Sequence, residues 1–305
     1  MDIHFAPLQG YADHIYRRLH ASLYGGISTY YSPFIRIEKG APRRQDIAHL
    51  QESIDDGINI IAQIIFNSTD EFKTLTAALK DLGISKIDLN LGCPYPMQTG
   101  KGRGTAMIAN VATMAEISEL INADTSTAYS LKMRLGQKSP DEWKALMPVL
   151  NATRLEHVTL HPRIAKQMYG GELFADEFPE FLQASKNPVI WNGDILSLDD
   201  ISRISAQYPQ LKAIMVGRGL LARPSLAAEW LSGEEWSAAK RMERLMQFHN
   251  LLFEAYESTL CGQTQILQKI KPFWDYLEPE IGHKPFKAIH KAATLDKYRA
   301  AVGSI

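Results

Sequence analysis

The sequence predicts an α/β protein, a (β/α)8 (TIM) barrel followed by a small all-α C-terminal segment. Eight mostly apolar stretches alternate with helical stretches, which is typical of parallel strands covered on both faces. The expected strands end at intervals of 25 to 31 residues, apart from one interval of 43. This regularity favours a closed barrel over an open doubly wound sheet. After about residue 239 the pattern becomes helical only, with prolines at 272, 279 and 285.

The strands are assigned from apolar, β-branched and aromatic runs. We expect them at Ile3–Leu8, Ile27–Ile35, Ile58–Phe66, Ile87–Leu91, Tyr129–Arg134, His157–His161, Pro188–Trp191 and Ala213–Val216. Helices between them begin at capping residues and end near glycines. They are expected at 13–23, from 46, from 68 or 69 to 83, at 111–122, at 139–153, to about 185, at 197–207 and from 219.

Composition limits the kind of protein. The chain has 305 residues, a net charge of −1 and two cysteines, Cys93 and Cys261, which give no disulfide framework. No apolar run is long enough to span a bilayer, and the first residues do not resemble a signal peptide. We therefore expect a cytoplasmic protein without a membrane partner. The order of elements predicts two domains, a barrel at 1–238 and a helical domain at 239–305.

The helical domain carries ten Lys or Arg against seven Asp or Glu, a net charge of +3. A basic helical segment on an acidic barrel suggests a binding module. The charge alone is equally compatible with a solvated helical bundle.

Cys93 lies in the most unusual stretch, Lys86–Met107, where a buried strand breaks into a loop rich in glycine and proline. The long interval of 43 residues contains this loop, so the extra residues were inserted beside the thiol. Functional groups are often placed on such loops. Cys261, in an expected helix, is interpreted as an inert thiol.

Polar side chains at the carboxyl ends of the strands are the candidate site residues, because active sites of (β/α)8 barrels lie at that end. They are Gln63, Asn90, Cys93, Lys132, Arg134, His161, Arg163, Asn192, Asp194 and Arg218. A lysine in a buried strand indicates either a functional group or a buried ion pair, here with Asp88 or Glu156. His161 alone fits a core histidine as well as a site residue.

The last two strands end in Asn192-Gly193-Asp194 and Gly217-Arg218-Gly219, and such loops often bind a phosphate in these barrels. The alternative is that the glycines only form tight turns. No Walker lysine, GxGxxG or HExxH motif is present, and the Cys and His spacing predicts no metal site. A phosphate loop together with amides and a lysine suits flavin mononucleotide (FMN), whose reduced ring Lys132 would stabilise.

Several segments in chain order resemble the tRNA-dihydrouridine synthase family. They are APLQGYAD at 6–13, Gln63, LNLGCP at 89–94, LKMRLG at 131–136, HPRIAKQMYGG at 161–171, NGDI at 192–195 and VGRGLL at 216–221. KIKPFWDYL at 269–277 is similar to a helix of the tRNA-binding domain that the family appends to its barrel.

The resemblance implies an FMN-dependent enzyme that reduces the C5–C6 bond of a D-loop uridine in tRNA, with uridine 16 as the expected position. NADPH, or NADH, would be the reductant and Cys93 the general acid. The implied FMN-binding residues are Ala6, Pro7, Leu8, Gln63, Lys132, His161, Asn192, Gly193, Asp194, Gly217 and Arg218. The implied substrate contacts are Asn90, Arg134, Arg163 and Arg36. We expect a monomer.

The sequence departs from the family pattern after the cysteine, where Met97 and Gln98 replace a basic residue and Lys101 follows. Pro162 replaces a glycine after His161, and Ile164 replaces a threonine. Two other functions compete with the synthase. One is a flavin-dependent reductase of a free pyrimidine, akin to dihydroorotate dehydrogenases, and the other is an RNA-binding protein without enzymatic activity.

Overall fold

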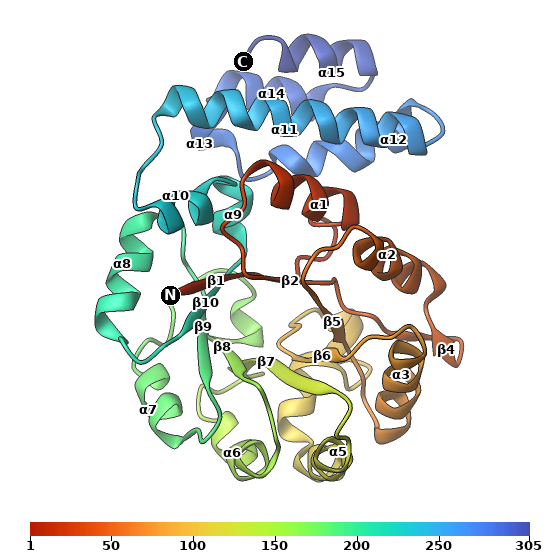
Figure 1. Cartoon of the computed structure of the whole chain (residues 1–305), viewed down its shortest axis with the longest axis vertical. Helices are drawn as coiled ribbons and strands as arrows, with labels where there is room; N and C mark the ends of the chain where they lie inside the picture. Colours follow the sequence, from red (N-terminus) through yellow and green to blue (C-terminus); the bar gives the residue numbers. More distant parts are fainter.

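Eight parallel strands close into a barrel in the computed structural model, which describes residues 1–54 and 56–305 (Figure 1). Around the barrel the strands are β1 (Asp2–Phe5), β2 (Thr29–Tyr31), β5 (Ile60–Ile64), β6 (Lys86–Leu91), β7 (Ala128–Gly136), β8 (Val158–Ile164), β9 (Val189–Asn192) and β10 (Ala213–Val216). Phe5 pairs with Val216, so the first and last strands are neighbours. The predicted fold class is confirmed.

Helices cover the outside of the barrel and form a second layer above it. The barrel helices are α1 (His14–Leu23), α2 (Arg44–Asp55), α3 (Thr69–Asp81), α4 (Pro96–Thr99), η1 (Gly104–Ala109), α5 (Val111–Ala123), α6 (Trp143–Ala152), η2 (Ala165–Gln167), α7 (Glu177–Ala184), α8 (Leu198–Gln207), α9 (Arg218–Ala222) and α10 (Leu226–Ser232). The upper layer contains α11 (Ala238–Thr259), α12 (Gln263–Ile270), η3 (Lys271–Trp274), α13 (Glu278–Ile281), α14 (His283–Lys291) and α15 (Leu295–Val302).

Most elements lie where the sequence predicts them, and the differences are local. The last strand and the caps Asp13, Ser68 and Ser197 are as expected, and each cap accepts a hydrogen bond from a backbone N–H in the first turn. A short hairpin of β3 (Ile37–Glu38) and β4 (Ala41–Pro42) forms between the second barrel strand and α2, where no strand was predicted. Cys261 lies between α11 and α12, not within a helix.

The interior of the barrel contains a buried network of two histidines and a tyrosine. Tyr31 places its hydroxyl 3.1 Å from His4 Nδ1 and 2.8 Å from His157 Nε2. Burial lowers the pKa of His4 to about 4 and that of His157 to about 3, so both rings are neutral at physiological pH. These three side chains therefore form an uncharged, hydrogen-bonded network inside the barrel.

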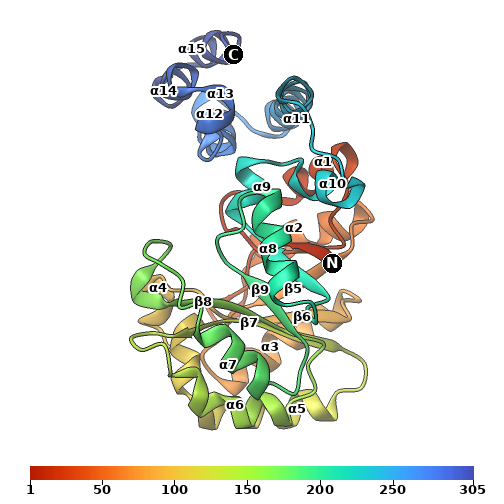
Figure 2. The same cartoon turned by 90° about the vertical axis from the view of Figure 1, so that its left-hand side faces the viewer.

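The upper helical layer packs on α1 through aromatic and polar contacts. The rings of Tyr16 and Phe248 lie 4.8 Å apart between α1 and α11. Asp13, which caps α1, also accepts a hydrogen bond from Tyr256 at 2.8 Å and pairs with Lys269 at 2.7 Å. Figure 2 shows that α12 to α15 overhang the side of the barrel on which α4 lies. No helix in the described residues is both long and apolar enough to cross a membrane.

Replacing Asp13 by Asn is expected to lower the free energy of unfolding by about 1–2 kcal/mol at neutral pH, because Lys269 loses its partner while the cap is kept. Burial raises the pKa of Asp13, but Lys269 and hydrogen bonds outweigh it and hold the pKa below the usual 3.8. The carboxylate therefore stabilises the fold above pH 3.8, and the difference between variant and wild type should shrink as the pH falls below that value.

Denaturant unfolding at several pH values measures this difference. Asp81→Asn, at an exposed position at the end of α3, is the control and should leave stability unchanged. A stability difference that stays constant down to acid pH would contradict the assignment of the ion pair.

Candidate active site

A pocket of about 620 Å³ opens at the carboxyl ends of the strands, beside a smaller cavity of about 80 Å³. Pro7, Leu8, Gly92, Lys132, Tyr169 and Arg218 line both. The larger pocket also reaches Tyr276, from the upper helical layer. Its size falls within the range of small-molecule and cofactor sites.

Asn90, near the end of β6, fixes the start of the cysteine loop. Its Oδ1 accepts hydrogen bonds from the backbone N–H groups of Gly92 at 3.1 Å and Cys93 at 2.9 Å. Its Nδ2 donates to Gln63 Oε1 at 2.7 Å. Gln63 in turn donates to Asp88, 2.7 Å away. A chain of buried hydrogen bonds therefore runs from the barrel interior to the cysteine backbone.

The other side of the Cys93 backbone is held by η1. Thr105 donates to the Cys93 carbonyl through its N–H at 3.1 Å and its hydroxyl at 3.3 Å. Gly104 has a φ of +62°, and a Cβ there would lie 2.6 Å from the Cys93 carbonyl oxygen, so only glycine fits. The Cys93 backbone is therefore held from both sides.

The thiol of Cys93 is buried, with 8% of the residue exposed, yet it lines the larger pocket. Burial raises its pKa above the usual 9.0, although Arg134 and Lys132 act in the opposite direction. The thiol therefore stays protonated at neutral pH. A protonated group at the wall of a pocket is suited to donate a proton and is a poor nucleophile.

Lys132 is a half-buried cation without an ion pair among the residues that the structure describes. Asp88, the partner considered from the sequence, accepts hydrogen bonds from Gln63 and from Ser130, the latter at 2.6 Å. Burial and the nearby charge of Arg134 lower the pKa of Lys132 to about 8. The ammonium group thus faces the pocket, where it can meet an anionic ligand.

Asp194 joins two arginines at the ends of β8 and β10. Its carboxylate lies 2.6 Å from Arg163 and 3.0 Å from Arg218. Arg163 also donates to His161 Nε2 at 3.1 Å, and because arginine only donates, the proton of the neutral ring resides on Nδ1. Burial, together with Arg134 and other cations, holds the pKa of His161 well below 6.5. His161 is therefore a neutral site residue.

Tyr169 is a site residue that was not predicted individually. Its ring contacts two guanidinium groups, with the Cζ atoms of Arg134 and Arg218 each 5.3 Å from the ring centroid. Such cation–π contacts position both guanidinium groups at the wall of the smaller cavity. The available signal was an aromatic residue in a glycine-flanked loop at a strand end, within the segment HPRIAKQMYGG.

The two glycine-containing loops approach each other closely. A Cβ on Gly219 would lie 2.0 Å from the Ile195 carbonyl oxygen, and one on Gly193 would lie 2.9 Å from the His161 ring. The smaller cavity between these loops is lined by three cations and one carboxylate: Lys132, Arg134, Arg218 and Asp194. The excess of positive charge suits an anionic group such as a phosphate.

The structure brings most of the predicted site residues together. The two cavities are lined by Ala6, Pro7, Leu8, Arg36, Gln63, Asn90, Cys93, Lys132, Arg134, His161, Asn192, Gly193, Asp194, Gly217 and Arg218. Arg163 lies outside this lining, with 3% of its side chain exposed and its donors bonded to His161, Asp194, Gly170 and Gly171. Met97, one of the departures from the family pattern, is 73% exposed at the rim.

Replacing Asn90 by Ala is expected to destabilise the fold by about 2–3 kcal/mol, because two backbone N–H groups and Gln63 lose their partner. The freed loop should also expose the Cys93 thiol. The rate of Cys93 alkylation by iodoacetamide, measured in a Cys261→Ser background, should therefore rise.

Thr74→Ala, at an exposed position on α3, serves as the control and should change neither quantity. An unchanged alkylation rate in Asn90→Ala would contradict the assigned role of Asn90 in holding the loop.

The fold and pocket define a (β/α)8-barrel protein with a cation-lined site at the open end of the barrel, and comparisons with known proteins specify its family. The family described as "Dihydrouridine synthase (Dus)" matches residues 4–297. The chain belongs to the dihydrouridine synthase family.

Individual relatives agree with this assignment. The chain is 25% identical over 258 residues to "Probable tRNA-dihydrouridine synthase 2" of Bacillus subtilis, covering 82% of this chain and 78% of the relative. It is 26% identical over 283 residues to "tRNA-dihydrouridine synthase B" of Pasteurella multocida, covering 92% and 80%. A match to a Staphylococcus epidermidis relative at 29% identity covers 67% of this chain and 62% of that protein.

Solved structures share the fold at low sequence identity. The old yellow enzyme from Trypanosoma cruzi aligns with a TM-score of 0.55 at 9% identity, covering 77% of this chain and 89% of that one. The old yellow enzyme homologue from Zymomonas mobilis aligns with a TM-score of 0.54 at 12% identity and the same coverage. These likenesses support the barrel and carry no further conclusion.

Proposed function

We propose that this protein is an FMN-dependent tRNA-dihydrouridine synthase that reduces the C5–C6 bond of a D-loop uridine, with NADPH as the reductant. The observation that carries the proposal is the placement of Cys93, Gln63 and Lys132 on one pocket, which adjoins a cavity with excess positive charge. Family membership supports the reaction class.

The residues present fit FMN. The cation-lined cavity suits its phosphate, and the larger pocket has room for the ring and a pyrimidine. Asn192, Gly193, Gly217 and Arg218 would hold the phosphate, with Lys132 beside the ring. When bound, the flavin supplies the hydride that is added to C6 of the uracil.

Cys93 would hold the proton that is added to C5. Its raised pKa keeps Sγ protonated at neutral pH, and the hydrogen bonds of Asn90 and Thr105 fix the backbone that carries it. Because the amide of Asn90 is engaged with the loop and Gln63, we assign Asn90 a positioning role in place of a direct contact with the base.

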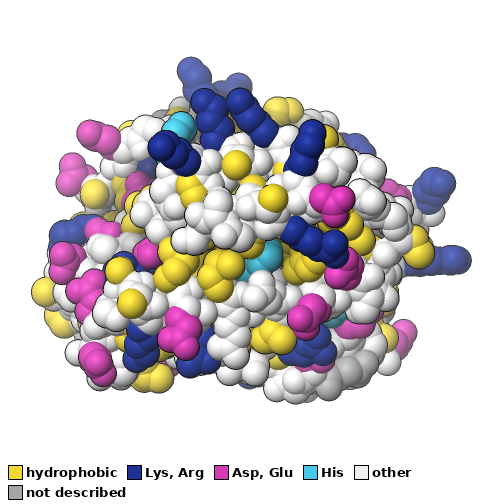
Figure 3. Space-filling view, turned by 90° about the horizontal axis from the view of Figure 1, so that it is seen from above, with side chains coloured by type: hydrophobic (Ala, Val, Ile, Leu, Met, Phe, Trp, Pro, Cys, Tyr) yellow, Lys and Arg dark blue, Asp and Glu magenta, His cyan; other side chains and the backbone are white. Residues whose placement is uncertain are grey.

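A uridine in folded tRNA must leave its stack to enter this pocket. The upper helical layer offers a surface for the surrounding tRNA. Lys284, Lys287 and Lys291 are exposed on one face of α14, a helix without acidic residues. Figure 3 looks down on this layer and shows Lys and Arg side chains gathered along one edge. Such a stripe suits contacts with backbone phosphates.

Replacing Cys93 by Ala should lower dihydrouridine formation by about 100-fold or more, because the proton donor is lost, while FMN and tRNA binding are kept. Digestion of the tRNA product followed by mass spectrometry measures the product directly. Cys261→Ala, which removes the exposed thiol, should retain full activity. Equal activity of Cys93→Ala and wild type would refute Cys93 as the acid.

Replacing Lys132 by Met should weaken FMN binding and stabilise the flavin-free protein by about 1–3 kcal/mol. The pKa of Lys132 is lowered to about 8, so its charge costs stability below that pH, and the cost disappears as the pH rises toward 10.5. Wild-type FMN affinity should fall as the pH rises through about 8, since the ammonium group loses its proton.

Quenching of flavin fluorescence measures the affinity, and the Met variant should lack this pH dependence. Lys86→Met, at the exposed start of β6, is the control and should behave as wild type. A wild-type affinity that does not change across this range would count against contact between Lys132 and the flavin.

Reversing the α14 stripe, as Lys284→Glu, Lys287→Glu and Lys291→Glu together, should weaken tRNA binding and reduce the slope of log K against log salt by about 2 to 3. Flavin content should not change, because the stripe does not line the flavin pocket. Filter binding over a range of salt concentrations provides the measurement.

The control is the pair Lys86→Glu and Lys212→Glu at the opposite, closed end of the barrel. Unchanged tRNA affinity in the triple variant would exclude the α14 stripe as a tRNA-binding surface.

The alternative function has its own test. Reduction of a free pyrimidine as fast as that of tRNA would favour a dihydroorotate dehydrogenase-like reductase.

A further inference from the structure

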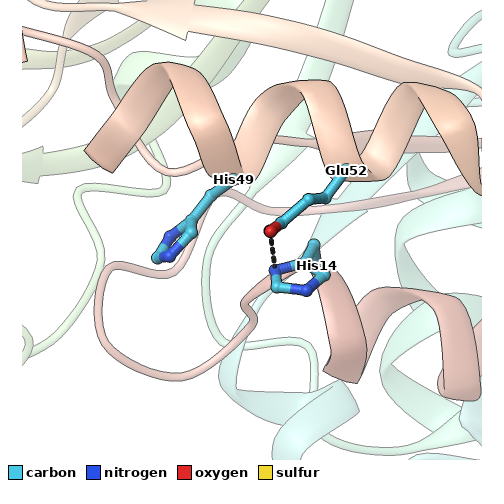
Figure 4. Close-up of side chains that lie close together, drawn as sticks. All are labelled: His14, His49 and Glu52. Atoms are coloured by element: carbon cyan, nitrogen blue, oxygen red, sulfur yellow. Dashed lines mark ion pairs between the residues drawn. The ribbon is translucent and has the colours of Figure 1, made fainter. Parts of the chain in front are cut away.

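Two histidines and a glutamate converge between helices α1 and α2 (Figure 4). His14 is the first residue of α1. His49 and Glu52 lie three positions apart on α2, so both project from the same side of that helix toward α1. One ligand atom of each residue lies within 4.8 Å of the other two. The catalytic proposal uses none of these residues.

His14 and Glu52 form an ion pair, drawn as a dashed line in Figure 4, whose two atoms are close but are not aligned as a hydrogen bond. His14 Nδ1 lies 2.9 Å from Glu52 Oε2, yet this buried nitrogen has no hydrogen-bond partner among the described residues. A buried ring nitrogen normally has one. A ring nitrogen and a carboxylate oxygen that lie this close without a hydrogen bond between them can also serve as two ligands of one metal ion.

Asp46 provides a second, independent observation. It lies one turn before His49 on α2, and both line a cavity of about 290 Å³. The Asp46 side chain is only 10% exposed, and its buried Oδ2 has no hydrogen-bond partner among the described residues. A metal-bound water, or the second ring nitrogen of a ligating histidine, is the type of donor that such a carboxylate oxygen accepts.

The surrounding charges permit a cation but limit its affinity. Arg43 pairs with Asp46 at 3.0 Å, and Lys269 pairs with Asp13 at 2.7 Å, so these two cations are balanced. Arg17 has no carboxylate partner among the described residues and donates to Ser53 at 2.6 Å. Its charge opposes a bound cation, while the carboxylate of Glu52 favours one.

The geometry points to a binding site for one Zn²⁺ ion, with His14, His49 and Glu52 as ligands and water in the fourth position. Two imidazoles and one carboxylate suit zinc, whereas Mg²⁺ and Ca²⁺ prefer oxygen ligands. The ion would join α1 to α2 beside Asp13, which anchors the upper helical layer. Its role would therefore be structural, and it is independent of the proposed reaction.

Isothermal titration of the flavin-loaded, full-length protein with ZnCl₂ tests the site. We expect one Zn²⁺ per chain, with affinity falling at least about tenfold in His49→Ala and in Glu52→Gln. His283→Ala removes an exposed histidine that pairs with Glu278 at 2.6 Å and should bind zinc as wild type does. Circular dichroism checks that each variant is folded.

Three results would overturn the inference: no binding by wild type, unchanged affinity in His49→Ala, or an equal loss in His283→Ala. Unchanged affinity in His49→Ala would leave His14 and Glu52 as an isolated pair. An equal loss in His283→Ala would indicate non-specific surface binding. Because the readout is zinc binding, failure here leaves the proposed synthase activity untouched, and failure of that activity leaves the zinc site untouched.

Discussion

The hydrogen bonds of the Asn90 side chain are the constraint on which the candidate active site depends. One amide group connects a barrel strand to the backbone on both sides of Gly92 and, through Gln63, to a buried carboxylate. A loop rich in glycine and proline would otherwise have many conformations. The amide selects one of them and places Cys93 against the pocket. The proposed acid is thus positioned by the strand that carries Asn90.

Charged side chains gather at one end of the barrel, and that is the end where we expect an anionic ligand to bind. At the closed end, His4, Tyr31 and His157 form an uncharged network. At the open end, Lys132 and Arg134 are kept as cations although burial lowers the pKa of each. Burying a cation without a carboxylate partner lowers stability. A bound anionic ligand would offset part of this loss of stability. Such a ligand would explain why a lysine occupies this position in β7.

The fold was predictable because each barrel strand is a short apolar run and each unit repeats at nearly the same interval. Most of the site was predictable for a related reason: in this fold, polar residues at strand ends meet at one rim. The contact of Tyr169 with two arginines was not predictable, because it depends on how the loop of Tyr169 packs against the end of β7 and the start of α9. The buried bonds of Arg163 to Asp194 and His161 were not predictable either, because the sequence alone does not distinguish a buried arginine from one that contacts substrate.

The segment from Ala6 to Asp13 links the pocket, where we propose that FMN binds, to the upper helical layer, where we propose that tRNA binds. Its first residues line the flavin pocket, and its last residue caps α1 and bonds to Tyr256 and Lys269 of the upper layer. Tyr11, between them, donates to Asp275 at 3.1 Å and contacts the ring of Tyr276, which also lines the pocket. A tRNA bound on the helical layer, as we propose, would be connected to the pocket through these eight residues. Because this segment both lines the pocket and bonds to the upper layer, it would help to set the distance between the proposed tRNA-binding surface and the base that reacts.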